Sequence, residues 1–536
     1  MPLPLKLLRR ARRILLPLTM AAMAVAPLPA QAREPAGQSV LVRTESGWVR
    51  GEDTSEGRQF LGIPYAQPPT GDRRWRAPRP AAHWSGVRDA TRYGNSCAQN
   101  PYWAPGHEKQ RTTEDCLDVN VYVPPSHRHG GKRPVLVWIH GGANIGGAGR
   151  DIVPDAFARR TGTVVVTLNY RLGALGFLTL PGTTGNFALL DQQQALRWVQ
   201  ANIGRFGGDR TRVTLAGESA GGSAVCTQLA SPGSRGLYRA AIMQSGTYGD
   251  CAGSPRKKAV ADGLAFAAKL GCTEAATAAD CLRRKPAKAI LDAQRGTGPD
   301  TWRSTVGGRE LPLQPATAFA TGRASHVPVM NGANSKEGLV FAYDSHDRWG
   351  TPLTAEQYPA ALTSAFGEEI GRRALDRYPL RAYDRPGYAL GTAIGDNLFA
   401  CPALRTNPRL AERGQVYAYV FADRTSPLFA SLPQDADFDF GATHAAELNY
   451  LFKPYGRPAD FNAEQRALAG QMTAYWGSFI HGSAPRANGQ QTMPEQIARP
   501  GRVLQLRTAS YGGNTITTSL RAEHHCDLWD TAARTH

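Results

Sequence analysis

After its first 32 residues, the sequence has no long uncharged apolar run. This argues against a later membrane-spanning helix, because such a helix needs ~20 apolar residues. The sequence also has no internal repeat and no low-complexity linker between residue 40 and the C-terminus, so we expect residues 33–536 to form one domain. Charged residues make up only 20% and hydrophobic residues 42%, which is typical of a globular chain with a large core.

Acidic residues are too few to balance the basic ones. The chain has 44 Asp and Glu against 62 Lys and Arg, a formal net charge of +18; five cations and no acid fall in the first 32 residues, which leaves +13. A nucleic-acid-binding surface needs clustered cations. The basic pairs here are dispersed, so we expect no nucleic-acid partner and a solvated surface that can be attracted to an anionic envelope. These pairs are Arg73-Arg74, Arg159-Arg160, Arg283-Arg284 and Arg372-Arg373.

The first 32 residues have the pattern of an export signal peptide. A basic start precedes an apolar run over residues 14–25, and residues 30–32 (Ala-Gln-Ala) form a small-x-small cleavage site, so the mature chain would begin at Arg33. The apolar run is too short to span a bilayer, although an uncleaved membrane anchor is the alternative. We expect a secreted or periplasmic protein without an integral membrane segment. Arginine pairs without a fuller consensus leave the general and the twin-arginine routes open.

Eight cysteines without a CxxC motif or a Cys/His cluster indicate disulfides rather than a metal centre, because an oxidising compartment keeps disulfides formed. Spacing alone leaves the pairing open. We expect Cys226 and Cys251 to be buried thiols. Two pairs of the others are close enough to close a short loop, and a third would tie the middle of the chain to its end: Cys97 with Cys116, Cys272 with Cys281, and Cys401 with Cys526.

Four short apolar runs bounded by turn residues predict strands that are buried on both faces of a parallel sheet. A stretch with helical periodicity, residues 188–206, lies between the second and the third run. This alternation predicts an α/β fold whose mostly parallel central sheet is flanked by helices. The Ala- and Arg-rich segments 255–325 and 355–412 are mostly helical in pattern, and we expect them to be insertions above the sheet that shape a substrate pocket. The four runs are residues 134–139, 164–168, 213–216 and 240–243.

The candidate nucleophile is Ser219, in the segment 217–221 (Gly-Glu-Ser-Ala-Gly). This segment directly follows the third predicted strand and precedes small residues that are able to begin a helix. A nucleophile elbow needs this context, because glycines permit a sharp turn that exposes the serine hydroxyl above the edge of the sheet. A bare G-x-S-x-G often arises by chance, but the strand before it and a glycine-rich segment upstream favour the catalytic interpretation.

The upstream segment, residues 140–144 (His-Gly-Gly-Ala-Asn), follows the first predicted strand. Backbone N–H groups at such a turn can stabilise the negative oxygen of a tetrahedral intermediate, and the loss of one donor costs ~3 kcal/mol. We assign Gly142, Ala143 and Ala220 as the oxyanion-hole donors. A turn that only reverses the chain is the alternative, but it would not explain the elbow downstream.

A serine hydroxyl needs a base, and the base needs a carboxylate that holds its tautomer. In the α/β-hydrolase fold their order along the chain is serine, acid, histidine. Glu337 is the best acid because it follows another strand-like run, residues 327–330, although a surface glutamate beside Lys336 is the simpler alternative. His444 is the best base because its loop enters an apolar stretch. Order alone also allows His346, His481, His524, His525 and His536.

Glu218 and Glu447 are candidate supporting residues. Glu447 would lie one turn after His444 if the segment is helical, and it could brace the loop; an ordinary surface glutamate is an equally good explanation. The spacing His444-x-x-Glu447-Leu448 lacks the second histidine of an H-x-x-E-H metal site, and no ligand cluster replaces it. We therefore expect no metal and no cofactor.

Several longer segments extend the pattern in chain order. With them the sequence resembles the type-B carboxylesterases, a family that includes the cholinesterases and bacterial p-nitrobenzyl esterases, from about residue 40 to 530. The most specific segment runs from Phe206 through the serine motif to Gly222. The others are residues 60–69 (FLGIPYAQPP), 114–117 with 119–121, 244–246, 334–338, 441–447 and 475–476.

This resemblance implies an α/β-hydrolase fold, carboxylic-ester hydrolysis through an acyl-enzyme, and a small-molecule or polymeric ester as substrate. It places the family's serine, glutamate and histidine on Ser219, Glu337 and His444. It also implies three disulfides, which join Cys97 to Cys116, Cys272 to Cys281 and Cys401 to Cys526. The rival class is a non-catalytic binding protein, since some members have lost the serine, but here all three residues are present.

Departures from the family pattern bear on the substrate. Ala143 replaces a frequent glycine, which its backbone N–H tolerates, and Asn144 stands where an aromatic is usual, so one pocket wall should be more polar. Asp118 replaces the usual Tyr or Thr of the second signature. Trp103 cannot be matched to the choline-binding tryptophan, so choline specificity is not implied. Aliphatic, aromatic, polyester and xenobiotic esters all remain open.

Overall fold

The computed structural model describes residues 38–101, 111–125, 131–297, 301–429, 437–497 and 499–533. The predicted signal peptide (residues 1–32), Arg33, Trp103 and His536 lie outside these ranges. Each predicted central strand is present, and neighbouring ones run parallel. The α/β fold is thereby confirmed. The four strands are β8 (Arg133–Ile139), β10 (Val164–Leu168), β11 (Gly208–Glu218) and β12 (Ala240–Gln244).

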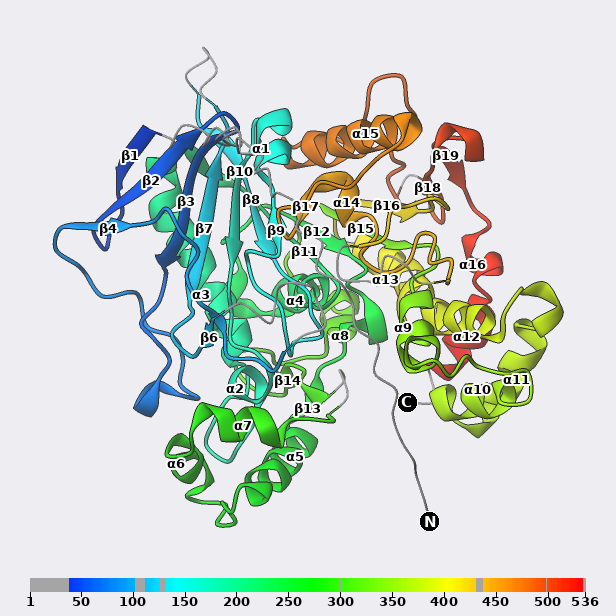
Figure 1. Ribbon diagram of the computed structural model, residues 1–536, viewed down its shortest axis with the longest axis horizontal. Helices are drawn as coiled ribbons and strands as arrows, with labels where there is room; N and C mark the ends of the chain where they lie inside the picture. Colours follow the sequence, from blue (N-terminus) through cyan, green and yellow to red (C-terminus); the bar gives the residue numbers. More distant parts are fainter. Residues whose placement is uncertain are drawn as a thin grey trace, which may run out of the picture. The chain divides into compact units, whose positions relative to one another are not determined.

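These strands form the centre of a sheet with thirteen strands in the described part of the chain, in the order β1-β2-β3-β7-β10-β8-β11-β12-β15-β16-β18-β19, with β4 beside β2 (Figure 1). Neighbouring strands are parallel in the stretch β10-β8-β11-β12-β15-β16-β18. The pairs β1–β2, β2–β3, β3–β7, β7–β10 and β18–β19 are antiparallel. The remaining strands are β1 (Gln38–Arg43), β2 (Trp48–Thr54), β3 (Gly57–Pro64), β4 (Val87–Asp89), β7 (Asp118–Val123), β15 (Val329–Asn334), β16 (Val416–Phe421), β18 (Val503–Leu506) and β19 (Thr515–Thr517).

Alternate side chains of β8 enter two different cores, which explains its uninterrupted apolar run. Val135 and Val137 pack in the core that contains residues of α3 (Phe187–Asn202) and α4 (Ala220–Ala230). Leu136 and Trp138 pack in the core that contains residues of α1 (Asp155–Thr161) and α15 (Ala463–Ile480). Helices therefore cover both faces of the sheet, and each fully buried aliphatic side chain contributes about 1.5–3 kcal/mol. The predicted helix 188–206 is α3 followed by a 3₁₀ turn, Ile203–Phe206.

The two segments expected to be insertions are largely helical, and Figure 1 shows α5, α6 and α7 grouped together and α10, α11 and α12 grouped together. Part of each segment instead packs on the sheet. Phe319 of α8 and Leu410 of α13 belong to the same core as Val329 of β15. The helices are α5 (Arg256–Lys269), α6 (Ala278–Arg283), α7 (Ala287–Ala293), α8 (Pro315–Ala320), α10 (Tyr358–Phe366), α11 (Glu368–Arg377), α12 (Pro386–Gly395) and α13 (Cys401–Ala411).

Four disulfides are present, and together they use all eight cysteines. The expectation that Cys226 and Cys251 are thiols is wrong, because their sulfurs form a bond across Cα atoms 6.2 Å apart. The chain passes through β12 between these residues and returns beside α4, a proximity that sequence spacing does not reveal. The other three bridges are Cys97–Cys116, Cys272–Cys281 and Cys401–Cys526. No helix in the described ranges is long and apolar enough to cross a membrane.

Candidate active site

Ser219 occupies a sharp turn between the end of β11 and the start of α4. Its φ and ψ are 55° and −125°, outside the regions that non-glycine residues favour, and such strain clusters at functional sites. A Cβ atom on Gly221 would lie 2.0 Å from the carbonyl oxygen of Ile139, and one on Gly217 would lie 2.5 Å from the carbonyl carbon of Gly221. Both glycines are therefore required by close backbone approach. The turn leaves Ser219 half-buried, and its side chain lines a cavity.

The turn after β8 presents backbone N–H groups to the same cavity. Gly142 and Ala143 have φ of 104° and 52°, and within the described residues neither N–H donates to a protein acceptor. Ala220 is the first residue of α4, where the N–H has no intrahelical acceptor. The three N–H groups assigned from the sequence are therefore free to bind an oxyanion.

His444 and Glu337 are brought together from segments 107 residues apart. His444 Nδ1 lies 2.6 Å from Glu337 Oε2. Glu337, which is 1% exposed, follows β15, and its other oxygen accepts hydrogen bonds from Ser245 Oγ (2.5 Å) and from the backbone N–H of Asn334 (2.7 Å). Sequence reasoning did not find the role of Ser245, although residues 244–246 formed one of the matched segments.

The other histidines allowed by chain order that the structure describes do not line the Ser219 cavity. His481 Nε2 contacts the carbonyl oxygen of Thr161, and His524 Nδ1 lies 2.6 Å from Asp396. His346 directly follows α9 (Leu339–Ser345), and His525 directly precedes α17 (Cys526–Ala532). Of this set, only His444 shares a cavity with Ser219.

Glu218 lies against the opposite edge of the His444 ring. Its Oε1 is 3.2 Å from His444 Nε2, and its side chain is 6% exposed. Burial raises the pKa of Glu218 to about 8. Burial by itself lowers the pKa of His444, but the carboxylates of Glu218 and Glu337 outweigh this effect and raise the pKa of His444 to about 9. The site thus favours a protonated imidazole.

Glu447 is fully buried, so it is not a surface residue, and its hydrogen bonds support the loop that carries His444. Its carboxylate accepts hydrogen bonds from Gln244 Nε2 (3.0 Å), at the end of β12, and from Asn334 Nδ2 (2.6 Å), at the end of β15. Asn334 Nδ2 also donates to the carbonyl oxygen of Thr443 (2.7 Å), the residue before His444. Burial raises the pKa of Glu447. The network joins the His444 loop to two strand ends.

Adjacent residues of the Ser219 turn line two different cavities. The larger, about 120 Å³, is lined by Ser219, His444 and Gly142 together with apolar residues such as Phe341 and Leu448. The smaller, about 30 Å³, is lined by Ala220 and Asn144. Asn144 Nδ2 donates to the carbonyl oxygen of Trp302, so the polar wall expected from this residue belongs to the smaller cavity. No cluster of three or more potential metal ligands occurs among the described residues.

A sheet of this topology, with a serine elbow, an adjoining N–H turn and a histidine–glutamate pair in chain order, defines an α/β-hydrolase. The chain belongs to the carboxylesterase family, whose model matches residues 38–529. It is a carboxylic-ester hydrolase.

Individual relatives and a solved structure are similar to this chain over most of its length. The chain is 34% identical to the fumonisin B1 esterase of Sphingopyxis macrogoltabida over 85% of its own length and 84% of the relative. It is 32% identical to the crystal protein of Dictyostelium discoideum, over 91% and 90%. A solved PNB esterase structure superposes with a TM-score of 0.75 at 31% identity, over 91% of this chain and 99% of that one.

Proposed function

We propose that the protein is an exported serine carboxylic-ester hydrolase in which Ser219 is the nucleophile, His444 the general base and Glu337 the residue that orients the base. The observation that carries the proposal is the 2.6 Å contact between His444 Nδ1 and Glu337, with Ser219 and His444 in one cavity. In the neutral imidazole, an Nδ1–H directed to a carboxylate leaves the lone pair of Nε2 as the site that accepts a proton.

In the first half-reaction, Ser219 Oγ attacks the ester carbonyl carbon while His444 Nε2 takes the hydroxyl proton. The carbonyl oxygen becomes an oxyanion and accepts hydrogen bonds from the N–H groups of Gly142, Ala143 and Ala220. The tetrahedral intermediate collapses, the bond to the alcohol oxygen breaks, and His444 gives its proton to the departing alcohol. The acyl group remains on Ser219.

In the second half-reaction, His444 takes a proton from water, whose oxygen attacks the acyl carbon. Collapse of the second intermediate breaks the bond to Ser219 Oγ, which regains a proton from His444, and the carboxylic acid leaves. Glu337 at one edge of the ring and the ionised form of Glu218 at the other stabilise the imidazolium that forms in each step.

Replacement of the nucleophile tests this proposal directly. Ser219→Ala should abolish hydrolysis of short p-nitrophenyl esters and labelling by a fluorophosphonate, while the circular-dichroism spectrum and the melting temperature stay near those of the wild type. Ser510→Ala, at a serine that contacts Glu464 outside the cavity, is the matched control and should keep full activity. Retained turnover in Ser219→Ala would refute the assignment.

Export is the second part of the proposal. It is supported by the signal-like residues 1–32 and by four disulfides, which persist in oxidising compartments. We propose that residues 33–536, whose described part belongs to one compact unit, are the mature catalytic domain. Cell fractionation with mass spectrometry of the N-terminus should find a chain that begins at Arg33 in the periplasm or medium. A cytosolic chain with an intact N-terminus would contradict export.

For the substrate, the relative named fumonisin B1 esterase makes fumonisin B1 one candidate ester. A hydrolysis panel that contains fumonisin B1, simple aliphatic and aromatic esters and a polyester film would rank these classes by kcat/KM.

A further inference from the structure

The small cavity at Ala220, the residue after Ser219, is lined by several parts of the chain. We call two of these walls: α4, with Ala220, Ser223 and Thr227, and the segment 248–253, with Tyr248 and Cys251. The rest of the lining is Asn144, Phe177, Leu189, Gln192, Arg303 and Ser304. Polar side chains, including Asn144 and Tyr248, line much of it. A cavity of about 30 Å³ has room for only a small group, since a single water needs roughly 10–15 Å³. It borders Ala220, an assigned oxyanion donor, and is therefore placed to receive one side of a bound ester.

The disulfide Cys226–Cys251 joins these two walls. Cys226 lies on α4, seven residues after the nucleophile, and Cys251 lines the cavity from the other side. Cys251 Sγ is also 3.7 Å from the carbonyl oxygen of Gly246. Gly246 packs so closely against Gly222 of α4 that a Cβ atom on it would lie 2.3 Å from the Gly222 carbonyl carbon. The second wall is therefore attached to α4 by the disulfide, and the chain just before it is held against α4 by the contact of Gly246 with Gly222.

The wall segment has a backbone conformation that does not form unaided. Gly249, Asp250 and Cys251 are three consecutive residues with φ between 56° and 58°, and two of them are not glycine. Non-glycine residues persist in the left-handed region only where surrounding contacts impose it. The disulfide holds Cys251, and Asp250 has a separate contact.

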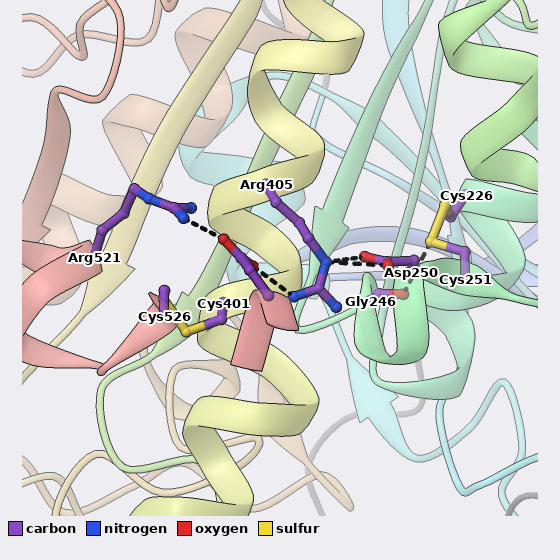
Figure 2. Close-up of polar contacts among 9 residues, drawn as sticks. Cys226, Gly246, Asp250, Cys251, Cys401, Arg405, Arg521 and Cys526 are labelled. Atoms are coloured by element: carbon purple, nitrogen blue, oxygen red, sulfur yellow. Dashed lines mark hydrogen bonds and ion pairs between the residues drawn. A yellow bond between two sulfur atoms is a disulfide. The ribbon is translucent and has the colours of Figure 1, made fainter. Parts of the chain in front are cut away.

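Arg405 of α13 provides that contact. Its Nε lies 2.7 Å and 3.0 Å from the two carboxylate oxygens of Asp250, and its Nη1 lies 3.1 Å from Asp530. Asp530 in turn pairs with Arg521. Figure 2 shows Arg405 on its helix, with Asp250 and the Cys226–Cys251 bridge on one side and the Cys401–Cys526 bridge on the other. The side chain of Arg405 is 13% exposed, so solvent weakens its ion pairs less than it weakens surface pairs.

The wall also contacts the proposed base through aromatic rings. The ring of Tyr248 lies 5.8 Å from that of Phe399, and the ring of Phe399 lies 4.8 Å from the imidazole of His444. A displaced wall would therefore alter the cavity and the packing of the base together.

We propose that the Cys226–Cys251 disulfide and the Asp250–Arg405 ion pair form a clamp that keeps this cavity small, and so restrict one side of the ester to a small, hydrogen-bonding group. The proposal rests on Ser219 as the nucleophile. The clamp residues are positioning residues, because they act through the wall and do not touch the reacting atoms.

The test removes each half of the clamp and measures selectivity. Two ester series are used: p-nitrophenyl esters from acetate to octanoate, and acetates of alcohols from methyl to octyl. In the double variant Cys226→Ala/Cys251→Ala, the ratio of kcat/KM for the longest to the shortest ester should rise roughly tenfold in one series only, because the cavity receives one side of the ester. In the wild type, kcat/KM in that same series should be higher for an ester with a methoxy-containing group than for its methylene isostere.

Controls separate a role in selectivity from a loss of fold. Cys272→Ala/Cys281→Ala removes a disulfide that does not line the cavity and should leave both ratios unchanged. Asp250→Asn keeps the disulfide and should move the ratio in the same direction by a smaller factor, whereas Asp250→Glu should restore it. Fluorophosphonate titration counts active sites, so a partly unfolded preparation lowers the rate on every ester and leaves the ratios intact.

The proposal would be overturned if the ratio of kcat/KM for long to short esters is unchanged both in Asp250→Asn and in a Cys226→Ala/Cys251→Ala enzyme whose active sites react with the fluorophosphonate. If the double variant gives no titratable enzyme, an unchanged ratio in Asp250→Asn alone would overturn it. An equal shift in the Cys272→Ala/Cys281→Ala control would also overturn it, as would a wild-type preference for the methylene isostere. None of these outcomes affects the assignment of Ser219, which fails only if Ser219→Ala keeps its activity.

Discussion

The carboxyl group of Glu218 lies 3.2 Å from Nε2 of His444, the nitrogen that takes the serine proton in the proposed mechanism. Glu218 immediately precedes Ser219, so the strand that delivers the nucleophile also delivers a charge to the base. Because this charge helps to raise the pKa of His444 to about 9, the free enzyme favours the imidazolium form. Activity should then depend on pH through His444.

Removal of this charge should shift the pH dependence of kcat/KM. In Glu218→Gln the imidazolium loses a neighbouring carboxylate, so the pKa of His444 falls. A general base must be unprotonated, so the acid limb of the profile should move to lower pH by roughly one unit. Glu464→Gln, at the start of α15, is the control and should leave the profile in place. An unmoved acid limb in Glu218→Gln, or one at higher pH, would contradict the prediction.

Glu337→Gln should cost far more activity than its small change in shape suggests. Ser245 and the Asn334 N–H would retain the amide oxygen as acceptor, which turns the amide N–H₂ toward His444 Nδ1. Nδ1 would then accept and Nε2 would carry the proton, the wrong tautomer for a base. We expect kcat to fall by roughly 10³- to 10⁴-fold with little change in KM. A fall of less than tenfold would argue against Glu337 as the orienting residue.

Glu447→Gln is the matched comparison, because it leaves the His444–Glu337 contact intact. One of the two amide groups that donate to Glu447, on Gln244 and Asn334, would lose its buried acceptor. The expected cost is about 1–3 kcal/mol in the free energy of unfolding, measured by denaturant titration. We expect kcat to fall by less than in Glu337→Gln. Equal losses of kcat in the two variants would place Glu447 in the reacting machinery.

Local signals in the sequence were sufficient for the centre of the fold. An apolar run such as residues 164–168 predicts a buried strand because both of its faces are covered, and the structure places β10 there. The strands β1 and β2 were not predicted, because apolar residues such as Leu41 and Trp48 occupy exposed positions and hide the alternation of buried and exposed residues. The run at 327–330 begins two residues before β15; Pro328 lacks the N–H that a strand ladder needs.

The contacts around the site depend on tertiary proximity, which the sequence does not display. Glu337 and His444 could be proposed from chain order and from the family resemblance. The hydrogen bond from Ser245 to Glu337 and the disulfide between Cys226 and Cys251 could not, because the first joins residues on either side of β15 and the second joins residues on either side of β12. The contact of Glu218 with His444 likewise depends on how two loops meet at the sheet edge.

Two glycine substitutions should have opposite effects on stability. In Gly221→Ala the new methyl group would lie 2.0 Å from the carbonyl oxygen of Ile139, so the elbow must move and both activity and melting temperature should fall. Gly470, an exposed residue within α15, has open space around an added Cβ atom. Gly470→Ala should stabilise the protein by about 0.5–1 kcal/mol. Thermal unfolding with a kcat measurement checks both; an active, stable Gly221→Ala enzyme would contradict the elbow packing.

The pairing of Cys226 with Cys251 makes a count of thiols decisive. With all eight cysteines in disulfides, iodoacetamide should modify none of them in the denatured, unreduced protein and all eight after reduction. Peptide mapping should recover residues 226 and 251 in one cross-linked fragment. Cys226→Ser is the positive control, because it should expose a single alkylatable thiol at Cys251. Alkylation of both residues in the unreduced wild type would support the original expectation from the sequence, and the wall of the small cavity would then lack its covalent tie to α4.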